Sequence, residues 1–236
     1  MKYLVSILLP SRKRFDALLK SVKSLYDKAE NPELIELLLR FDEDDLDSIA
    51  RIKEIDEITT NYQYIIGERY EGYFSLDKFV NELCEISQGD FFLLWNDDAL
   101  MMNYNWDGVI SLYESETVCL QMDNNHFPYI FPIISRDIYE ALGYFSGFPC
   151  DTWIHDVCSP LGIEIIEDEI YAIHDRADVT GNNDDETYKE SMNSGRFTHT
   201  IQTEGEDTAS TYYSAEVQKL VKEDIIKLKK YLDSKK

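Results

Sequence analysis

Cysteine, basic residues and long apolar runs are all scarce in this sequence. Its 236 residues include four cysteines, and these show no C-x-x-C spacing. Without paired spacing we expect no zinc site, and we expect free, mostly buried thiols in a reducing compartment. No apolar run approaches the ~20 residues that a transmembrane helix needs, and no signal peptide precedes the first strand-like run. These absences predict a soluble, cytoplasmic protein with no transmembrane segment.

The small number of basic residues leaves a strong negative charge. There are 23 lysine and arginine residues against 46 acidic ones, which gives a formal net charge of -23. A field of this sign repels nucleic acid and anionic membranes, so we expect neither as a partner. It would also repel a diphosphate, so a ligand that carries phosphates would need a bridging cation. With 44% hydrophobic and 13% aromatic residues, the chain can bury a real core.

Apolar runs and amphipathic segments alternate through the first hundred residues. Continuous apolar runs are typical of buried parallel strands, and apolar residues at helical spacing are typical of helices that cover them. The predicted strands are residues 3–9, 33–41, 62–66 and 91–95, and the predicted helices are 15–25, 46–55 and 76–86. This order predicts an α/β fold with a mostly parallel central sheet and helices on both faces. Right-handed crossovers would bring residues 10–14, 42–45 and 96–98 to one edge of that sheet.

The second half of the sequence is less regular. We predict two short strands that would suit an antiparallel pair, a helix that begins at the N-cap Ser135, a further helix, and a last segment of strand or hairpin. These elements are residues 118–122, 129–133, 135–142, 151–161 and 163–173. The division that follows is a main domain over 1–177, a flexible polar loop over 178–213, and a C-terminal helix over 214–236 that packs on the domain.

The most informative motif is Asn96-Asp97-Asp98, at the end of an apolar run. Adjacent acids at the end of a buried strand repel one another, which costs stability unless a cation lies between them. The carboxyl ends of strands in an open α/β sheet are also where ligands bind. The motif therefore predicts a divalent-metal site that receives a phosphorylated ligand. The alternative is a turn in which these side chains bond local backbone groups, but a position directly after an apolar strand favours the metal.

Five segments in this order resemble the GT-A glycosyltransferases, in particular the family-2-like enzymes. They are VSILLPSR (5–12), RFDEDD (40–45), GDFFLLWNDD (89–98), DTW (151–153) ahead of Leu161-Gly162, and His174. The resemblance covers roughly residues 3–180. It implies a nucleotide-diphospho-sugar transferase fold, with 1–177 as the catalytic domain. It also implies hexosyltransferase-like transfer of a sugar to a hydroxyl of a glycan, lipid or protein acceptor. The transfer would be metal-dependent and inverting, since inversion needs only one base.

The resemblance also implies a site for Mn²⁺ or Mg²⁺. The family's strand-end motif usually reads Asp-x-Asp, so Asn96 is a departure from the pattern. Asp98 is the implied direct ligand with Asp97 close by, while Asn96 would hydrogen-bond a ribose hydroxyl or a metal-bound water. His174 is implied as a further ligand, because many metal-dependent members supply a histidine at this point and imidazole suits Mn²⁺. The remaining histidines, which lack such a context and receive no role, are His126, His155 and His199.

The loops after the first strands supply the residues implied for the nucleotide. Arginine suits bidentate contact with phosphate, and two arginines follow the first strand. Asp42 ends the second strand, where the family's acid accepts hydrogen bonds from the base of the donor. Asp45 is instead predicted as the N-cap of the next helix. The complete predicted nucleotide-binding set is Pro10, Ser11, Arg12, Arg14, Asp42, Asn96 and Asp97.

Asp151 is the implied general base, which would take the proton from the acceptor hydroxyl. The family often shows Glu-Asp here, whereas this chain has Cys150-Asp151, so the match is partial. A helix N-terminus would lower the pKa of this carboxyl, which keeps it ionised but weakens it as a base. Two alternatives stay open, namely Asp151 as a simple N-cap and Asp156 as the base.

Two other classes of function fit parts of the sequence. A sugar-phosphate nucleotidyltransferase shares the sheet and the metal, but typically carries a glycine-rich loop with a lysine, and PSRK (10–13) has no glycine. A non-catalytic sugar- or partner-binding protein on a degenerate GT-A scaffold is favoured by Asn96 and by the partial Glu-Asp match. The segment 178–213 would be either a lid that closes over a bound donor or a disordered connector.

Overall fold

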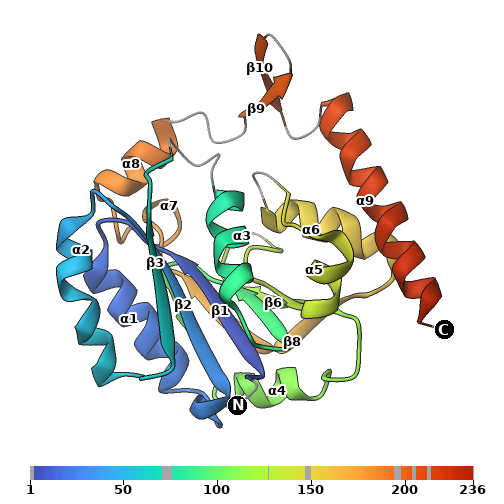
Figure 1. Cartoon of the computed structure of the whole chain (residues 1–236). Helices are drawn as coiled ribbons and strands as arrows, with labels where there is room; N and C mark the ends of the chain where they lie inside the picture. The colour runs from blue at the N-terminus through green and yellow to red at the C-terminus, as the bar shows by residue number, and fades with distance from the viewer. Residues whose placement is uncertain are drawn as a thin grey trace.

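An eight-stranded sheet with helices on both faces organises the chain (Figure 1). The computed structural model describes residues 3–70, 76–126, 128–146, 150–193, 198–203, 206–211 and 214–235. In spatial order the strands are β3 (Tyr62–Gly67), β2 (Ile35–Asp42), β1 (Val5–Pro10), β4 (Phe91–Leu94), β7 (Pro132–Ser135), β6 (Cys119–Asn124), β8 (Glu164–His174) and β5 (Ala99–Met101). The pairs β3–β2, β2–β1, β1–β4 and β6–β8 are parallel, and β7 and β5 pair antiparallel with their neighbours. The predicted α/β class and mostly parallel sheet are confirmed.

Each face of the sheet carries its own hydrophobic core, because successive side chains of a strand point to opposite faces. Val5, Ile7 and Leu9 of β1 belong to one cluster, and Leu8 belongs to the other. The first cluster packs under α1 (Phe15–Tyr26), α2 (Leu46–Arg51) with the 3₁₀ turn Ile52–Glu57, and α4 (Trp106–Ser111). The second packs under α3 (Leu76–Ile86), α5 (Arg136–Leu142) and α6 (Cys150–Cys158), with α9 (Ala215–Ser234) outside on α5 and α6. None of the described helices is long and apolar enough to cross a membrane.

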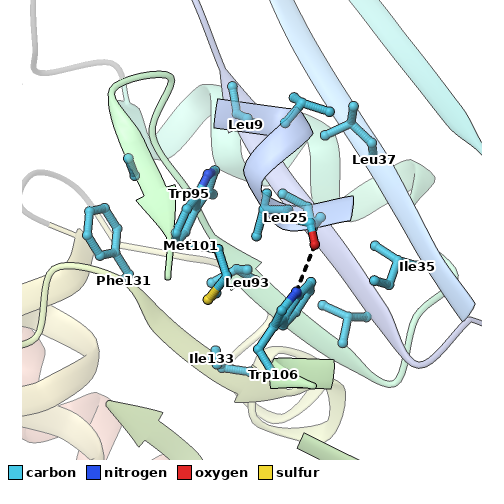
Figure 2. Close-up of a cluster of buried hydrophobic side chains, with 14 of the residues drawn as sticks. Leu9, Leu25, Ile35, Leu37, Leu93, Trp95, Met101, Trp106, Phe131 and Ile133 are labelled. Atoms are coloured by element: carbon cyan, nitrogen blue, oxygen red, sulfur yellow. Dashed lines mark hydrogen bonds between the residues drawn. The ribbon is translucent and has the colours of Figure 1, made fainter. Parts of the chain in front are cut away.

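Two buried tryptophans tie α1 to the sheet in the first cluster (Figure 2). Trp106 Nε1 donates to the carbonyl oxygen of Leu25 at 3.0 Å, and Trp95 Nε1 donates to Ser21 Oγ at 2.8 Å. Both indole N–H groups therefore keep a hydrogen-bond partner inside the core, as buried tryptophans require. Trp95 directly follows β4, so its bond to α1 fixes the chain immediately before Asn96.

The observed elements match most of the predicted ones, with differences at their ends and in the second half. Strand β5 and helix α4 were not predicted, because one is only three residues long and the other follows Asn105, which has a left-handed φ of 61°. Ser135 does precede α5, but its side chain makes no cap bond. Its hydroxyl instead accepts from Val118 N at 2.9 Å. The four cysteines are free and buried, as predicted.

The segment predicted as a flexible polar loop, 178–213, contains regular structure. It includes most of α7 (Ala177–Thr180), then α8 (Glu186–Asn193) and the antiparallel pair β9 (Thr198–Thr203) and β10 (Glu206–Thr211), while 194–197, 204–205 and 212–213 lie outside the described residues. Polar contacts stabilise these elements, so hydrophobic periodicity did not reveal them. The Asp185 carboxylate, for example, accepts from Tyr188 N at 2.8 Å at the start of α8. The predicted C-terminal helix is present as α9, and Ser214 caps it by accepting from Val217 N. The division into domains stays a prediction.

The turn that leads into β4 packs against β1 and β2 without room for a side chain. Glu36 Oε1, in the middle of the sheet, accepts from Ser6 Oγ at 2.5 Å and from Gly89 N at 2.9 Å. A Cβ added to Gly89 would lie 2.5 Å from Ser6 Oγ and 2.6 Å from Ser6 N. Only glycine therefore fits where the chain enters the strand that carries the Asn96-Asp97-Asp98 motif.

We expect Gly89→Ala to lower the free energy of unfolding by about 2 to 3 kcal/mol, because backbone atoms of β1 would have to move to admit the methyl group. Urea unfolding followed by circular dichroism measures the change. Gly162→Ala is the control, since its Cβ would meet nothing within 4 Å and only its φ of 68° is unfavourable. That variant should lose about 1 kcal/mol. An equal loss in the two variants would show that packing at Gly89 is not the constraint.

Candidate functional site

The three loops that were expected to converge do lie together at the carboxyl ends of β1, β2 and β4. Ser11 Oγ donates to Asp97 Oδ2 at 2.8 Å, across 86 positions of sequence. Arg12 Nη1 lies 3.1 Å from Asp42 Oδ2 and also contacts Asp44. Pro10 closes β1 opposite Arg40 of β2, directly before these side chains. The crossover argument from sequence is confirmed at this edge of the sheet.

The turn that bears the acidic pair is held from α1. The carbonyl oxygen of Asn96 accepts from Ser21 Oγ at 3.0 Å and from Ala99 N at 3.2 Å. Asp97 and Asp98 follow, and both are buried. The motif is therefore a rigid turn as well as an acidic one, and its two carboxyl groups are largely withdrawn from water.

Arg14 is the cation that lies between these acids. Its Nη1 atom is 3.2 Å from Asp97 Oδ1 and 3.1 Å from Asp98 Oδ2. Burial would lower the pKa of Arg14, but the charges of Asp97, Asp185 and Asp98 raise it above its ordinary value. The sequence predicted that a cation must offset the repulsion of the pair, and the described residues supply a guanidinium that does so.

The two acids have pKa values shifted in opposite directions. Burial, together with the charge of Asp98, raises the pKa of Asp97. Burial also acts to raise the pKa of Asp98, but the hydrogen bond and charge of His174 and the charge of Arg14 outweigh it, so this pKa is lowered. Asp98 is therefore the member of the pair that stays firmly ionised.

His174 meets Asp98 at the end of β8. Its Nε2 atom lies 3.2 Å from Asp98 Oδ1, because Ala99 of β5 pairs with His174 across the antiparallel ladder. The backbone N–H of His174 donates to Asn125 Oδ1 at 2.7 Å, which fixes the end of the strand. The structure thus brings together the two residues predicted as metal ligands, although 76 positions separate them in sequence.

The chemistry of Asp98 and His174 fits a divalent cation that completes its shell elsewhere. Two ligands in adjacent positions of an octahedral ion, at bonds of about 2.1 Å, lie roughly 3 Å apart, close to the separation between Asp98 Oδ1 and His174 Nε2. His174 Nδ1 is buried and has no hydrogen-bond partner among the described residues. No group of three or more candidate ligands occurs in the described part of the chain. An ion here would take its remaining ligands from water and from the phosphates of a ligand, as Mg²⁺ commonly does.

Asp42 is held by arginines on both of its oxygens. Arg40, which is buried in the sheet, contacts Oδ1, and Arg12 contacts Oδ2. Arg40 is also stacked 4.1 Å from the ring centre of Phe79. Asp45 caps α2 by accepting from Ser48 N, as predicted, and it also accepts from Lys13 N at 2.7 Å. The loop after β2 therefore holds the loop after β1 in place through these contacts.

Asp151 is the second residue of α6, so it is not the N-cap that was left open as an alternative. Its carboxylate accepts from Thr152 N at 2.7 Å. Burial raises the pKa of Asp151 to about 6, and the bond from Thr152 and the charge of His174 only partly offset it. The predicted lowering by the helix N-terminus is wrong, because desolvation outweighs it. Asp156, the alternative base, lies further along the same helix.

Residues 175–187, most of which belong to the segment predicted to be either a lid over a bound donor or a disordered connector, lie against the loop after β1. Arg14 Nε donates to Asp185 Oδ2 at 2.7 Å, and Arg14 Nη2 donates to the carbonyl oxygen of Asn183 at 3.3 Å. Thr187 Oγ1 donates to the carbonyl oxygen of Arg12 at 3.1 Å, and Lys20 Nζ lies 3.0 Å from Asp175 Oδ2. In the sequence, the only indication that these residues contact the loop after β1 is their polar composition, which is equally typical of a connector.

The histidines that received no role occupy different environments. The ring of His126 packs edge-on to His174, with centroids 5.5 Å apart. His155 lies on α6 and contacts Glu164. The side chain of His199 lies outside the described part of the structure.

Solved structures resemble this fold, whereas no protein-family model and no curated protein matches the sequence. The mannosyltransferase PcManGT from Pyrobaculum calidifontis, in complex with GDP-Man and Mn²⁺, is 12% identical, with a TM-score of 0.59 over 73% of this chain and 57% of that chain. S. aureus TarS 1-349, in complex with UDP-GlcNAc, is 14% identical, with a TM-score of 0.59 over 80% of this chain and 64% of that chain. The chain thus spans less than two thirds of either of these chains.

These likenesses define the class of fold. The chain has a GT-A-like glycosyltransferase fold, with its acidic strand-end motif at the carboxyl edge of the sheet. At 12–14% identity the likeness extends to the fold alone.

We expect Asp185→Asn to loosen residues 183–189 with little change in global stability. Asparagine can still cap α8, so the variant removes mainly the charge that pairs with Arg14. An ion pair worth about 1 kcal/mol would make local amide exchange roughly fivefold faster. Hydrogen exchange with mass spectrometry measures this. Asp184→Asn, which removes an exposed partner of Lys189, is the matched control and should leave exchange unchanged. Equal exchange in both variants would show that Arg14 does not hold the segment.

Proposed function

We propose that the chain is a glycosyltransferase that moves a sugar from a nucleotide-diphosphate sugar to an acceptor hydroxyl. The observation that carries the proposal is the contact of Asp98 with His174 beside Arg14, at the carboxyl edge of a GT-A-like sheet. An ionised carboxylate, an imidazole and an arginine together suit a metal-bound diphosphate. Two solved structures of similar fold are complexes with GDP-Man and with UDP-GlcNAc, which supports a donor of this chemical class.

Asp98 and His174 would hold Mn²⁺ or Mg²⁺. When bound, such an ion acts as a Lewis acid that stabilises the negative charge developing on the nucleoside diphosphate leaving group. The PcManGT complex contains Mn²⁺, which supports use of a divalent ion by a protein of this fold. Asp97, paired with Ser11 and Arg14, orients the guanidinium, which also contacts Asp98 Oδ2, while Asp98 Oδ1 faces His174.

The nucleotide would lie along the loops after β1 and β2. The guanidinium group of Arg12 donates to Asp42 and Asp44, so its position is fixed before a ligand binds. Asp42 is buried and ordered by Arg40, which suits it to accept hydrogen bonds from the base of the donor. Asn96, whose carbonyl oxygen is fixed by Ser21, would offer its amide to the ribose or to a metal-bound water.

Asp151 would take the proton from the acceptor hydroxyl. A general base works best when its pKa lies near the working pH, and burial moves this carboxyl in that direction. A single base of this kind serves direct displacement with inversion. Transfer reactions with a panel of UDP- and GDP-sugars, followed by stereochemical analysis of the product, would test both the donor and the outcome.

A second candidate is a non-catalytic nucleotide-sugar or partner-binding protein on the same scaffold. Arg14 already lies between Asp97 and Asp98 and offsets part of their charge, and this observation favours a site that functions without a metal. Titration calorimetry with UDP and GDP, with Mn²⁺ or with a chelator, distinguishes the two. Nucleotide binding that persists in the chelator, with no hydrolysis or transfer from any donor, would favour the binding protein.

We expect Asp98→Ala and His174→Ala each to lower sugar transfer at least about 100-fold, because the leaving diphosphate would lose its Lewis acid. The same variants should abolish the part of nucleotide affinity that depends on Mn²⁺. Asp168→Ala is the matched control, since it removes an exposed carboxylate of the same strand, β8. Retention of full transfer by Asp98→Ala would exclude the proposed metal site.

We expect kcat/KM for transfer to fall about tenfold per pH unit below pH about 6. A base with a raised pKa is protonated below that pH and cannot accept the hydroxyl proton, so activity is present above its pKa and lost below it. Asp151→Asn should lose at least about 100-fold and should remove this acidic limb. Asp156→Asn serves as the control and tests the alternative base. If Asp156→Asn removes the limb instead, the assignment of Asp151 is wrong.

A further inference from the structure

A second cluster of aromatic and titratable side chains surrounds His155 of α6, apart from the residues of the candidate site. The ring of Tyr129 stacks on His155, with centroids 3.6 Å apart and planes inclined by 12°. His155 Nδ1 lies 2.9 Å from each carboxylate oxygen of Glu164, at the start of β8. Gln121 Nε2 donates to the same carboxylate at 2.8 Å. The imidazole is therefore fixed by a ring on one face and by a carboxylate at one edge.

Tyr129 adopts a backbone conformation that bulky residues avoid. Its φ is 77°, in the left-handed region that favours glycine. Tyr129 is half-buried, and 22% of the His155 side chain is exposed, so the ring pair reaches the surface. A tyrosine kept in place against its backbone preference, and stacked at the surface, indicates a role for the ring beyond packing.

The ring pair borders the candidate site. The loop between β6 and β7 contacts His174 near both of its ends, through the bond from His174 N to Asn125 and through the ring of Phe131, 5.3 Å from the imidazole. Tyr129 lies between these contacts in sequence. On α6, Asp151 and His155 are four residues apart, so their side chains are neighbours on one face of the helix. His155, with Tyr129 stacked on it, therefore lies one helical turn from Asp151.

We propose that Tyr129 and His155 bind the acceptor, and that this acceptor is a neutral glycoside. The proposal rests on the proposed function and adds the acceptor class to it. The apolar face of a sugar ring suits the flat, amphipathic ring of a tyrosine. With Nδ1–H donated to Glu164, the imidazole keeps Nε2 as an acceptor for a sugar hydroxyl. Asp151, Glu164 and the net charge of -23 disfavour an anionic acceptor.

Saturation-transfer NMR tests this binding directly, without catalysis. The probes are the methyl glycosides of glucose, galactose, mannose and N-acetylglucosamine, with methyl glucuronide as the anionic comparison, each with and without UDP and Mn²⁺. We expect a signal from at least one neutral glycoside. Tyr129→Gly and His155→Ala should each weaken it about fivefold or more, since a stacking partner is lost. Tyr104→Ala removes an exposed tyrosine elsewhere, on the loop before α4, and should leave the signal unchanged.

Tyr129→Gly separates binding from folding, because glycine tolerates the positive φ. We expect its melting temperature to equal or exceed that of the unaltered protein while glycoside binding is lost. A lower melting temperature together with a lost signal would mark Tyr129 as a packing residue and overturn the proposal. So would the absence of any neutral glycoside signal, a signal that both variants retain, or a preference for the glucuronide.

Hydrolysis of UDP- and GDP-sugars without acceptor, measured on the same proteins, keeps the two proposals apart. Suppose that the unaltered protein hydrolyses a donor, while Tyr129→Gly and His155→Ala leave glycoside binding unchanged. The transferase proposal then stands, and the proposal that these two residues bind the acceptor is wrong. If no donor is hydrolysed and no nucleotide binds, the proposed function falls. The glycoside signal and its dependence on the two rings then still decide whether this surface binds sugar.

Discussion

The contact of Arg14 with Asp97 and Asp98 is the interaction on which the candidate site depends. Two adjacent buried carboxylates repel one another and lose hydration, and either cost alone would disfavour the turn. One nitrogen of Arg14 lies within 3.2 Å of both acids, and His174 adds a second donor to Asp98. This arrangement requires the ends of β1, β4 and β8 to meet. The two hydrophobic cores and the tryptophan bonds to α1 are what hold them in that position.

The same guanidinium links the acids to the segment after β8. Arg14 uses its Nε atom for Asp185 and its Nη1 atom for Asp97 and Asp98, so the segment and the acidic pair share one cation. A phosphate group suits arginine better than a half-exposed carboxylate does, because it offers several charged oxygens in bidentate geometry. A diphosphate at this edge would therefore compete with Asp185 for Arg14. In the proposed transferase, donor binding and the position of residues 175–187 would be coupled through this exchange.

The sequence was sufficient to predict the strands and loops that form this site, but it was insufficient to predict the contacts between their side chains. Apolar runs located β1, β2 and β4, and the crossover rule placed their loops together, because both depend on backbone geometry and burial alone. The meeting of Asp98 with His174 was implied only by the family resemblance, since nothing in the spacing of two residues 76 positions apart requires it. The pairing of Arg14 was not foreseen, because it depends on a loop in which Lys13 takes a positive φ of 55°. Asp185 was missed because polar caps, which leave no periodicity, order α8.

The carboxyl groups of the site are distinguished by their surroundings more than by their position in the motif. Asp98 has a lowered pKa because His174 and Arg14 offset its burial, so it is suited to hold positive charge throughout the physiological range. Among the described residues no arginine contributes to the pKa of Asp151, and burial raises that pKa to about 6, so this carboxyl can gain and lose a proton. Acids whose environments separate their pKa values in this way can take different chemical roles at one site. A helix N-terminus favours ionised Asp151, yet desolvation prevails. The packing around α6, which sequence alone does not reveal, therefore sets the pKa that would suit this residue to the proposed role of base.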